Sequence, residues 1–426
     1  MTLRRVETGR RERAVAARPG QVEWLVLVLV TLGLVAFGLV MVFSATSASA
    51  TLGGGEPGYY LKRQAIYASA GLALLVAVSR FDFRRLRRIA PALVAVSLIL
   101  CLAVLVLAEP VNGARRWLTF GPATFQPSEL AKLSIAVWAA AYLTRRRPPQ
   151  TLRELGRPLG LVVGATCLLI LLGPDLGTTI SLLVMLGAVL CVAGVPGRTL
   201  LGGAAIVATL GTAAIWLEPY RRERFLSFLD PWSDPQNNGF QTVQAQIGLG
   251  SGGLFGEGLG RGVAKIFYLP EAHTDMIFAI VGEELGLVGS TAVICAYALF
   301  AYAGLRIALA CRDPFGKRLA AALTVLVCGQ AAINLAAVLG LAPLTGIPLP
   351  FLSYGGSNLV VQLASVGILL NIAVHGGRSA SAAVPDRDRG DGRPRAARPG
   401  GRRRVEPARR AGDVRRVGAR RGAARS

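Results

Sequence analysis

The sequence predicts an all-α protein that crosses a membrane many times, and two observations support this. Apolar residues make up 53% of the 426 residues, whereas only 17% are charged. The apolar residues fall into blocks of about 17–25, the length at which a helix spans roughly 30 Å of hydrocarbon. A soluble domain with one core needs no such blocks. We therefore predict a polytopic membrane protein with about ten transmembrane helices.

The first predicted span, 24–43, follows a basic segment, 1–23, and is too long for a signal-peptide core. It is expected to stay in the protein as an anchor, although the SATSASA after it could pass for a cleavage region. The predicted spans are residues 24–43, 65–79, 89–108, 128–144, 157–172, 177–195, 199–217, 276–310, 317–340 and 356–375.

Arg and Lys in the short connections predict the orientation of these spans. They gather in the N-terminal segment and in the connections 80–88, 145–157 and 312–318. These connections alternate along the chain, so we place them, with both termini, on the cytoplasmic side. The opposite side then receives a large extracytoplasmic loop, 218–275, between spans 7 and 8.

The formal net charge of +23 invites comparison with nucleic-acid-binding proteins, but its distribution argues against them. The segment after Gly377 holds 16 Arg against five Asp or Glu and is rich in Gly, Ala and Pro. Such a composition buries little, so we predict a disordered, Arg-rich cytoplasmic tail over 376–426. We expect it to attract anionic lipid and no specific nucleic acid. The spans between the basic N-terminal tail and this tail form one membrane domain, 24–375.

Ionisable residues are concentrated where the polar stretch YLPEAHTD runs into the eighth span. Glu271, His273 and Asp275 lie at this junction, and Glu283 and Glu284 follow about two turns into the apolar helix. Carboxylates at membrane depth are costly and often functional. Asp275 could cap the helix, or it could act on a polar substrate at the membrane boundary, and both interpretations remain open.

A second group of charged residues lies in NGARRWLTFGPATFQPSELAK. Arg115 and Arg116 are either solvated loop residues or, with Trp117 beside them, hold a pyrophosphate by charge-assisted contacts. Glu129 and Lys132, spaced i, i+3, can pair on one helix face. That pair either fixes helix packing or contributes to a site.

Ser128, just after a proline, is expected to cap the fourth span. A broken backbone is predicted for PLTGIPLPFLSYGGSN, because prolines and glycines at membrane depth are tolerated when buried in protein or lining a polar cavity. Ser353, Tyr354 and Ser357 are expected to shape the wall of such a cavity. Asp175, at a Gly-Pro turn, either caps the next helix or contacts the cavity.

Other motifs are excluded. Gly248, Gly250 and Gly253 have dinucleotide-fingerprint spacing, but no hydrophobic strand precedes them. No Walker-type loop, HExxH pair or Cys/His cluster occurs in the sequence. The six cysteines lie within or at the ends of the spans without metal-site spacing, so we expect buried free thiols.

Several stretches, in this order along the chain, resemble one known family. They are NGARRW, FQPSELAK, GPDLGTT, FLDPWSDP, GSGGLFGEGLG, YLPEAHTDMIFAIVGEELG and GIPLPFLSYGGSN. They look like the bacterial shape, elongation, division and sporulation (SEDS) family of FtsW, RodA and SpoVE, over residues 24–375. Three stretches are more similar to the cell-division branch, FtsW: EAHTD, NGARRWLTFGPATFQPSELAK and FLDPWSDP. By contrast, GIPLPFLSYGGSN shares features with the elongation branch, RodA.

The resemblance implies a ten-helix peptidoglycan glycosyltransferase, a hexosyltransferase that polymerises lipid II at the outer face of the bacterial cytoplasmic membrane, at the division septum. It implies lipid II and nascent undecaprenyl-pyrophosphate-linked glycan as substrates. It also implies a class B penicillin-binding protein, a transpeptidase, and other divisome proteins as partners. No organic cofactor is implied. Whether the reaction needs a divalent cation, Mg or Mn, remains open, and no residue is a certain metal ligand.

The family's essential aspartate, in its HTD motif, matches Asp275. On this hypothesis Asp275 is the general base of one inverting displacement that converts an α-linked lipid sugar into a β-linked glycan. Arg115, Arg116 or Lys132 would hold the departing pyrophosphate. The remaining substrate-binding residues are then Trp117, Glu129, Glu271, His273, Ser353 and Ser357.

One position departs from the family pattern. Many division-type relatives carry an acidic residue in the short stretch before YLPEAHTD, where this chain has Lys265, Ile266 and Phe267. If that acid helps to bind a metal or the substrate, another residue, such as Glu257 or Glu271, must do so in this chain. Three other functions remain open: a lipid II flippase, an elongation-type polymerase, or a scaffold that only recruits the transpeptidase. The lack of a clear internal repeat weighs against the flippase.

Overall fold

The computed structural model describes residues 21–52, 56–110, 114–121, 123–237, 239–266, 269 and 272–376. All of them belong to one compact unit of the chain. The predicted tails, 1–23 and 376–426, lie outside the described residues except for residues 21–23 and 376. Glu271 also lies outside them.

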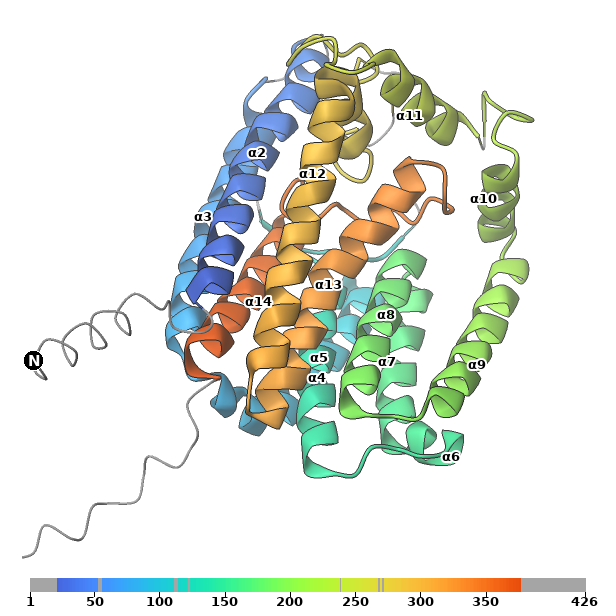
Figure 1. Cartoon of the computed structure of the whole chain (residues 1–426). Coiled ribbons are helices and arrows are strands. Elements are labelled where there is room, and N and C mark those ends of the chain that lie inside the picture. Colours follow the sequence, from blue (N-terminus) through green and yellow to red (C-terminus); the bar gives the residue numbers. More distant parts are fainter. Residues whose placement is uncertain are drawn as a thin grey trace, which may run out of the picture. The chain divides into compact units, whose positions relative to one another are not determined.

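The described part of the chain is almost entirely helical (Figure 1). The helices that correspond to the ten predicted spans are α2 (Gln21–Leu52), α3 (Tyr59–Arg80), α4 (Leu86–Leu107), α5 (Pro127–Arg145), α7 (Leu161–Leu172), α8 (Leu176–Ala193), α9 (Gly197–Trp216), α12 (Ile277–Ala310), α13 (Pro314–Val338) and α14 (Gly356–His375). The connections contain η1 (Phe83–Arg85), the paired strands β1 (Leu118–Phe120) and β2 (Ala123–Phe125), α6 (Leu152–Leu155), η2 (Gly156–Gly160), α10 (Pro219–Leu229) and α11 (Phe240–Ser251). The predicted all-α polytopic fold is confirmed.

Nine stretches of the described residues are long and apolar enough to cross a membrane, and α5 is not among them. Helix α5 has 19 residues, carries Glu129 and Lys132 in its first turns, and is largely buried by other helices. Helix α5 is therefore surrounded mainly by other helices of the protein. The count of ten transmembrane spans stays a prediction. The expected cap of α5 was wrong: Gln126 is the N-cap, Pro127 opens the helix, and Ser128 lies inside it.

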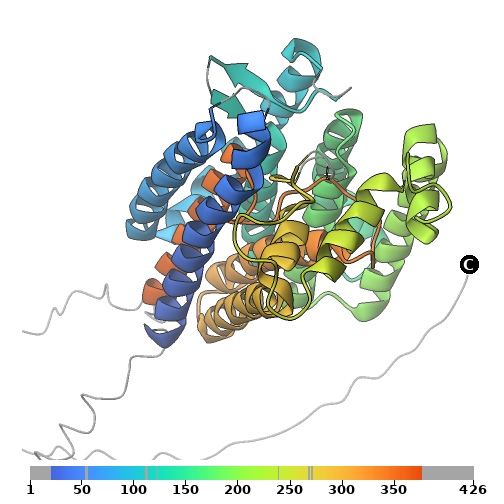
Figure 2. The ribbon, with the colours of Figure 1, turned by 90° about the horizontal axis from the view of Figure 1, so that it is seen from above.

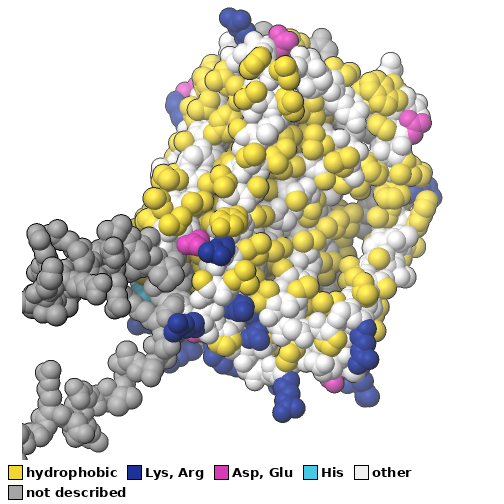
Figure 3. Space-filling model, in the orientation of Figure 1, with side chains coloured by type: hydrophobic (Ala, Val, Ile, Leu, Met, Phe, Trp, Pro, Cys, Tyr) yellow, Lys and Arg dark blue, Asp and Glu magenta, His cyan; other side chains and the backbone are white. Residues whose placement is uncertain are grey.

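The helices pack around α13 and α14, in which 67% and 78% of the most apolar stretch is buried. Helix α3 packs along α14, α2 along α12, and α8 along α13. By contrast, only 6% of the apolar stretch of α9 is buried, and this helix lies at the right-hand edge of Figure 2. Apolar side chains cover the flank seen in Figure 3, as expected of a surface that faces lipid.

The six cysteines are free thiols, as predicted. Cys101, Cys167 and Cys311 are buried, but Cys191 and Cys295 are exposed. The expectation of burial was wrong for these two because they lie on outward faces of α8 and α12. A thiol behaves as a small apolar group and can face lipid at little cost.

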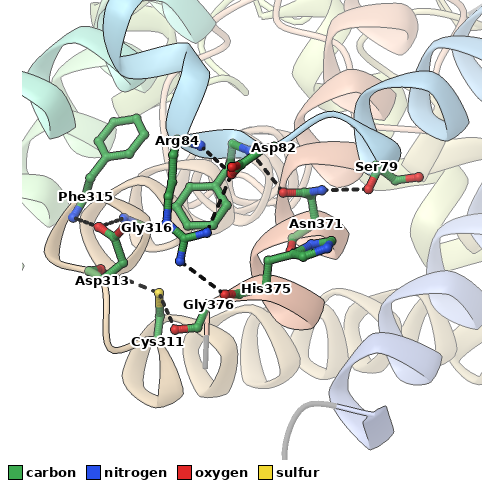
Figure 4. A network of polar contacts seen from close by, with 11 residues as sticks. Ser79, Asp82, Arg84, Cys311, Asp313, Phe315, Gly316, Asn371, His375 and Gly376 are labelled. Atoms are coloured by element: carbon green, nitrogen blue, oxygen red, sulfur yellow. Dashed lines mark hydrogen bonds and ion pairs between the residues drawn. The ribbon is translucent and has the colours of Figure 1, made fainter. Parts of the chain in front are cut away.

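Polar contacts join the turns at one end of the bundle (Figure 4). Arg84, between α3 and α4, pairs through Nε with Asp313 Oδ2 at 3.1 Å. Asn371 of α14 accepts the Phe83 N–H at 3.1 Å and donates to the Ser79 carbonyl oxygen at 2.7 Å. Lys and Arg side chains gather at this end in Figure 3. The Arg84 network therefore lies at the end that we predict to be cytoplasmic.

Asp313 both caps α13 and pairs with Arg84, so its loss should lower stability. Its carboxylate accepts the N–H of Phe315 at 2.9 Å and that of Gly316 at 3.4 Å. We expect Asp313→Ala to lower the free energy of unfolding by about 1–2 kcal/mol, mostly through the lost cap. Asp313→Asn keeps a capping oxygen and should lose only the smaller, ion-pair part. Thermal unfolding in detergent measures both, and an unchanged melting temperature for Asp313→Ala would contradict these roles.

Candidate functional site

A cavity of about 650 Å³ opens at the end of the bundle opposite the Arg84 network. The starts of α5, α8 and α14 form part of its wall, with α10 and the broken loop 343–348. Five predicted site residues line it: Arg116, Trp117, Glu129, Asp275 and Ser357. The structure places four others outside the lining: Arg115, Lys132, His273 and Ser353.

Asp275 lies half-buried in the cavity wall, just before α12. The N-cap of α12 is Met276, so the carboxylate does not occupy the capping position. The Thr274 hydroxyl donates to Asp275 Oδ1 at 3.2 Å, and Asn334 Nδ2 donates to the Asp275 carbonyl oxygen at 2.7 Å. A Cβ at Gly346 would lie 4.0 Å from Asp275 Oδ2. The carboxylate therefore lies against the 343–348 loop.

The two predicted arginines bind backbone carbonyl groups. Arg116 donates from Nε to the Gly173 carbonyl oxygen at 3.0 Å and from Nη2 to that of Pro174. Arg115 is exposed and donates to the Leu105 carbonyl oxygen at 3.0 Å. The bonds of Arg116 use two of the five N–H donors of a guanidinium. Arg116 thus fixes the Gly-Pro turn while remaining part of the cavity wall.

Asp175 both caps a helix and lines the cavity. Its Oδ1 accepts the Thr178 N–H of α8 at 3.0 Å, and its Oδ2 accepts from Gln126 Nε2 at 3.1 Å. The Gln126 N–H in turn donates to Ser357 Oγ at 3.0 Å, and that hydroxyl donates to the Thr124 carbonyl oxygen at 3.1 Å. Ser357 therefore ties the start of α14 to the strand before α5.

The predicted ion pair of α5 is confirmed. Lys132 Nζ lies 3.0 Å from Glu129 Oε2, with the two side chains 0% and 2% exposed. Lys132 also donates to Gln330 Oε1 at 2.7 Å, and Asn358 Nδ2 donates to Glu129 Oε2 at 2.8 Å. Glu129 reaches the cavity, whereas Lys132 lies behind it as a buried counter-charge.

His273 and Ser353 hold the loops that surround the cavity. The His273 ring packs against Tyr60 and Tyr354, with centroid distances of 4.7 and 5.5 Å. The His273 carbonyl oxygen accepts the Tyr354 N–H at 2.8 Å. Ser353 Oγ accepts the Leu349 N–H at 2.8 Å. The stretch around Asp275 is thereby joined to the loop that precedes α14.

The carboxylates inside α12 have partners that offset their burial. Glu283 Oε1 accepts the Val263 N–H at 2.7 Å. Glu284 Oε1 lies 2.5 Å from Lys265 Nζ and accepts from the Ser44 hydroxyl of α2 at 2.7 Å. Lys265 is therefore the buried counter-charge of Glu284.

The glycine-rich stretch before α12 supplies hydrogen-bond partners for backbone groups at a break in that helix. The backbone of α12 is interrupted at Gly286, with φ 64° and ψ −157°. Glu257 and Gly258 donate their N–H groups to the carbonyl oxygens of Glu283 and Glu284, both at 3.0 Å. Of the three glycines with fingerprint spacing, Gly248 and Gly250 lie inside helix α11, which agrees with the exclusion of a dinucleotide fingerprint.

Sequence reasoning missed two kinds of residue at the site. Arg224 of α10 lines the cavity, but no motif in the sequence singled it out as a site residue. Gln330 and Asn334 of α13 bind the loop 343–348. Their spacing of four within an apolar span was the signal that could have found them, because it places two amides on one helix face.

The described residues contain no group of three His, Cys, Asp or Glu side chains arranged to hold a metal ion. The Asp175 and Glu129 carboxylates in the cavity wall bind protein donors instead. A divalent cation therefore stays a prediction. It would be an ion that arrives with a substrate's phosphates, as Mg²⁺ commonly does.

The cavity combines one half-buried carboxylate, Asp275, with the guanidinium groups of Arg116 and Arg224 in its wall. A carboxylate can accept a proton from an attacking hydroxyl. Guanidinium groups can stabilise an anionic leaving group. The arrangement suits transfer of a group from a phosphate-type leaving group to a hydroxyl.

Comparison with known proteins gives a consistent result. The family model FTSW_RODA_SPOVE, described as "Cell cycle protein", matches residues 24–377. "Probable peptidoglycan glycosyltransferase FtsW" of Geobacter metallireducens is 40% identical over 352 residues, covering 82% of this chain and 94% of that protein. The protein of the same name from Mycobacterium tuberculosis is 39% identical over 358 residues, covering 83% of this chain and 68% of that protein.

Two solved structures share the fold. One is described as "Structural coordination of polymerization and crosslinking by a peptidoglycan synthase complex". Its matching chain has a TM-score of 0.68 and 33% identity, covering 82% of this chain and 96% of that one. The other is the rod shape determining protein RodA of Thermus thermophilus, with a TM-score of 0.62 and 30% identity, covering 83% and 97%.

Proposed function

Because the chain belongs to the FtsW/RodA/SpoVE family of cell cycle proteins, we propose that it is a peptidoglycan glycosyltransferase that polymerises lipid II during septal cell-wall synthesis. The observation that carries the proposal is the cavity in which Asp275 lies with Arg116 and Arg224. Relatives named peptidoglycan glycosyltransferase match over 82% of this chain. The family model matches residues 24–377, which include every helix that lines the cavity.

The proposed reaction is one inverting displacement. The 4-hydroxyl oxygen of lipid II forms a bond to the anomeric carbon at the reducing end of the growing strand, and the bond from that carbon to the pyrophosphate breaks. Asp275 takes the proton of the attacking hydroxyl. Arg116 and Arg224 bind the departing pyrophosphate. Attack opposite the leaving group converts the α-linked sugar into a β-linked one.

We place the cavity at the outer face of the bacterial cytoplasmic membrane, with both termini in the cytoplasm. The support is the distribution of charge, since the Lys and Arg of the short connections gather at the other end of the bundle (Figure 3). A class B penicillin-binding protein is the proposed partner, in line with the similarity to a chain of a peptidoglycan synthase complex. Other divisome proteins would recruit the pair to the septum.

The proposal is tested on purified protein in detergent, with and without its cognate transpeptidase. Lipid II is added, and the products are separated on a gel that resolves glycan strands. We expect polymer from the wild-type protein. No polymer, even with the transpeptidase bound, would contradict the proposal and favour a flippase or a scaffold. Translocation of lipid II in liposomes would then separate those two.

Arg224 gives a prediction that concerns substrate binding. We expect Arg224→Gln to raise KM for lipid II by about 10- to 100-fold, because a hydrogen bond to a charged group contributes roughly 1.5–3 kcal/mol. Arg222→Gln is the matched control, since Arg222 is exposed on the same helix and outside the cavity lining. Steady-state polymerisation rates measure both. Equal KM values for the two variants would exclude a binding role for Arg224.

A further inference from the structure

A buried amide on α13 joins two parts of the cavity wall. Asn334 is 2% exposed, and its Nδ2 donates to the carbonyl oxygens of Asp275 at 2.7 Å and Ile347 at 2.8 Å. A side-chain amide carries two N–H donors, so both are used. Asn334 Oδ1 has no hydrogen-bond partner among the described residues. Turning the amide would set this oxygen against two carbonyl oxygens, which fixes its orientation.

Asn334 is one of two side-chain amides on α13 that bind different backbone groups. Gln330, one turn earlier on α13, donates from Nε2 to the Pro348 carbonyl oxygen at 2.8 Å and accepts from Lys132 through Oε1. Both amides therefore hold the loop 343–348 against α13. Of the two, Asn334 also binds the Asp275 backbone.

The Asp275 stretch is tied to the neighbouring loop at two points. The Tyr354 N–H donates to the His273 carbonyl oxygen at 2.8 Å, and Asn334 bridges Asp275 and Ile347. The second tie acts at Asp275 itself. A general base must lie within about 2.6–3.2 Å of the group whose proton it takes. A small shift of this backbone would therefore carry the carboxylate out of reach of its substrate.

We propose that Asn334 is a positioning residue, which holds the Asp275 carboxylate at its working place by binding the Asp275 and Ile347 carbonyl groups together. This inference rests on the proposed function, in which Asp275 is the base. Asn334 lies outside the cavity lining, so its effect on the reaction passes through Asp275. Arg116, which we propose to bind the pyrophosphate, is held separately, by the Gly173 and Pro174 carbonyl groups.

The test is Asn334→Leu, which removes both donors with little change in volume. We expect kcat for lipid II polymerisation to fall by roughly 100-fold, the size of effect that a displacement of about 1 Å produces. KM should stay near its wild-type value, because the wall residues that bind the substrate keep their places. Asn334→Ser keeps one donor and should give an intermediate kcat. It replaces Asn334→Leu in the test if that variant does not fold.

Asn371 provides a matched control at the other end of the bundle (Figure 4). It is also a buried asparagine with two hydrogen bonds, to the Ser79 carbonyl oxygen and from the Phe83 N–H. Asn371→Leu should lower the melting temperature about as much as Asn334→Leu, yet keep the wild-type kcat at a temperature where both are folded.

Either of two results would overturn the positioning role. One is a folded Asn334→Leu variant with wild-type kcat, and the other is an equal loss of kcat in Asn334→Leu and Asn371→Leu. A wild-type protein that forms no polymer is a different result. It would overturn the proposed function, and this inference with it.

Discussion

We expect the Asp275→Asn variant to lose polymerisation of lipid II by at least about 100-fold, the lower end of what a general base contributes. Asparagine has nearly the same shape as aspartate, but its side chain cannot accept the hydroxyl proton. Its oxygen can still accept from the Thr274 hydroxyl, which donates to Asp275 Oδ1 at 3.2 Å. The fold should therefore be kept, and the initial rate of glycan formation is the measurement.

Two controls separate chemistry from stability in the Asp275 experiment. The first is thermal unfolding, in which Asp275→Asn should match the wild type. The second is Glu223→Gln, the same change of carboxylate to amide at an exposed residue of α10 outside the cavity lining. Near wild-type rates from folded Asp275→Asn would rule out the general-base role. If complex formation with the transpeptidase were also intact, they would favour a scaffold.

Lys132→Met should be the most destabilising single change at the site. Lys132 is fully buried, 3.0 Å from Glu129, and removing it leaves the Glu129 carboxylate without its counter-charge. Breaking a buried ion pair in this way costs about 3–5 kcal/mol. Thermal unfolding in detergent measures the loss. Unchanged melting together with lost activity would instead assign Lys132 to substrate binding.

The double variant Glu129→Gln/Lys132→Met is the control for that interpretation. It removes both charges, and a glutamine at position 129 can still accept from Asn358 Nδ2, which donates to Glu129 Oε2 at 2.8 Å. We expect it to recover most of the stability lost in Lys132→Met, because a buried pair can often be replaced by neutral groups of similar volume. A double variant as unstable as the single one would show that the methionine itself disrupts packing.

The helices could be predicted because hydropathy is a local signal that each span carries in its own residues. All ten predicted spans coincide with helices. Their ends were less predictable: α2 continues to Leu52, past the predicted end at residue 43. The residues between are mainly Ala, Ser and Thr, which a helix accepts although hydropathy does not detect them.

The site was predictable where a charged residue stood against an apolar background, as for Asp275 and the pair Glu129 and Lys132. Arg224 and Asn334 could not be found this way, because their roles depend on which loops the fold brings to them. Ser128 fits the general preference of helix caps, but the N-cap lies two residues earlier, at Gln126, and the helix begins at Pro127. The position of a helix cap and the partners of a polar side chain depend on residues distant in the sequence. The periodicity of apolar residues therefore does not predict them.

The break in α12 has a consequence for how this protein can vary in length. The N–H groups of Leu287 and Val288 donate to the carbonyl oxygens of Gly253 and Leu254 at 2.9 and 3.2 Å. A residue inserted or deleted between Gly253 and Gly258 would shift this register and leave several backbone groups unpaired at membrane depth. Substitutions there should disturb the structure less, since the side chains of Leu254 and Phe255 are 62% and 79% exposed. In a library of single-codon insertions and deletions, this short stretch should be among the least tolerant of the chain, whereas its non-glycine side chains remain free to change.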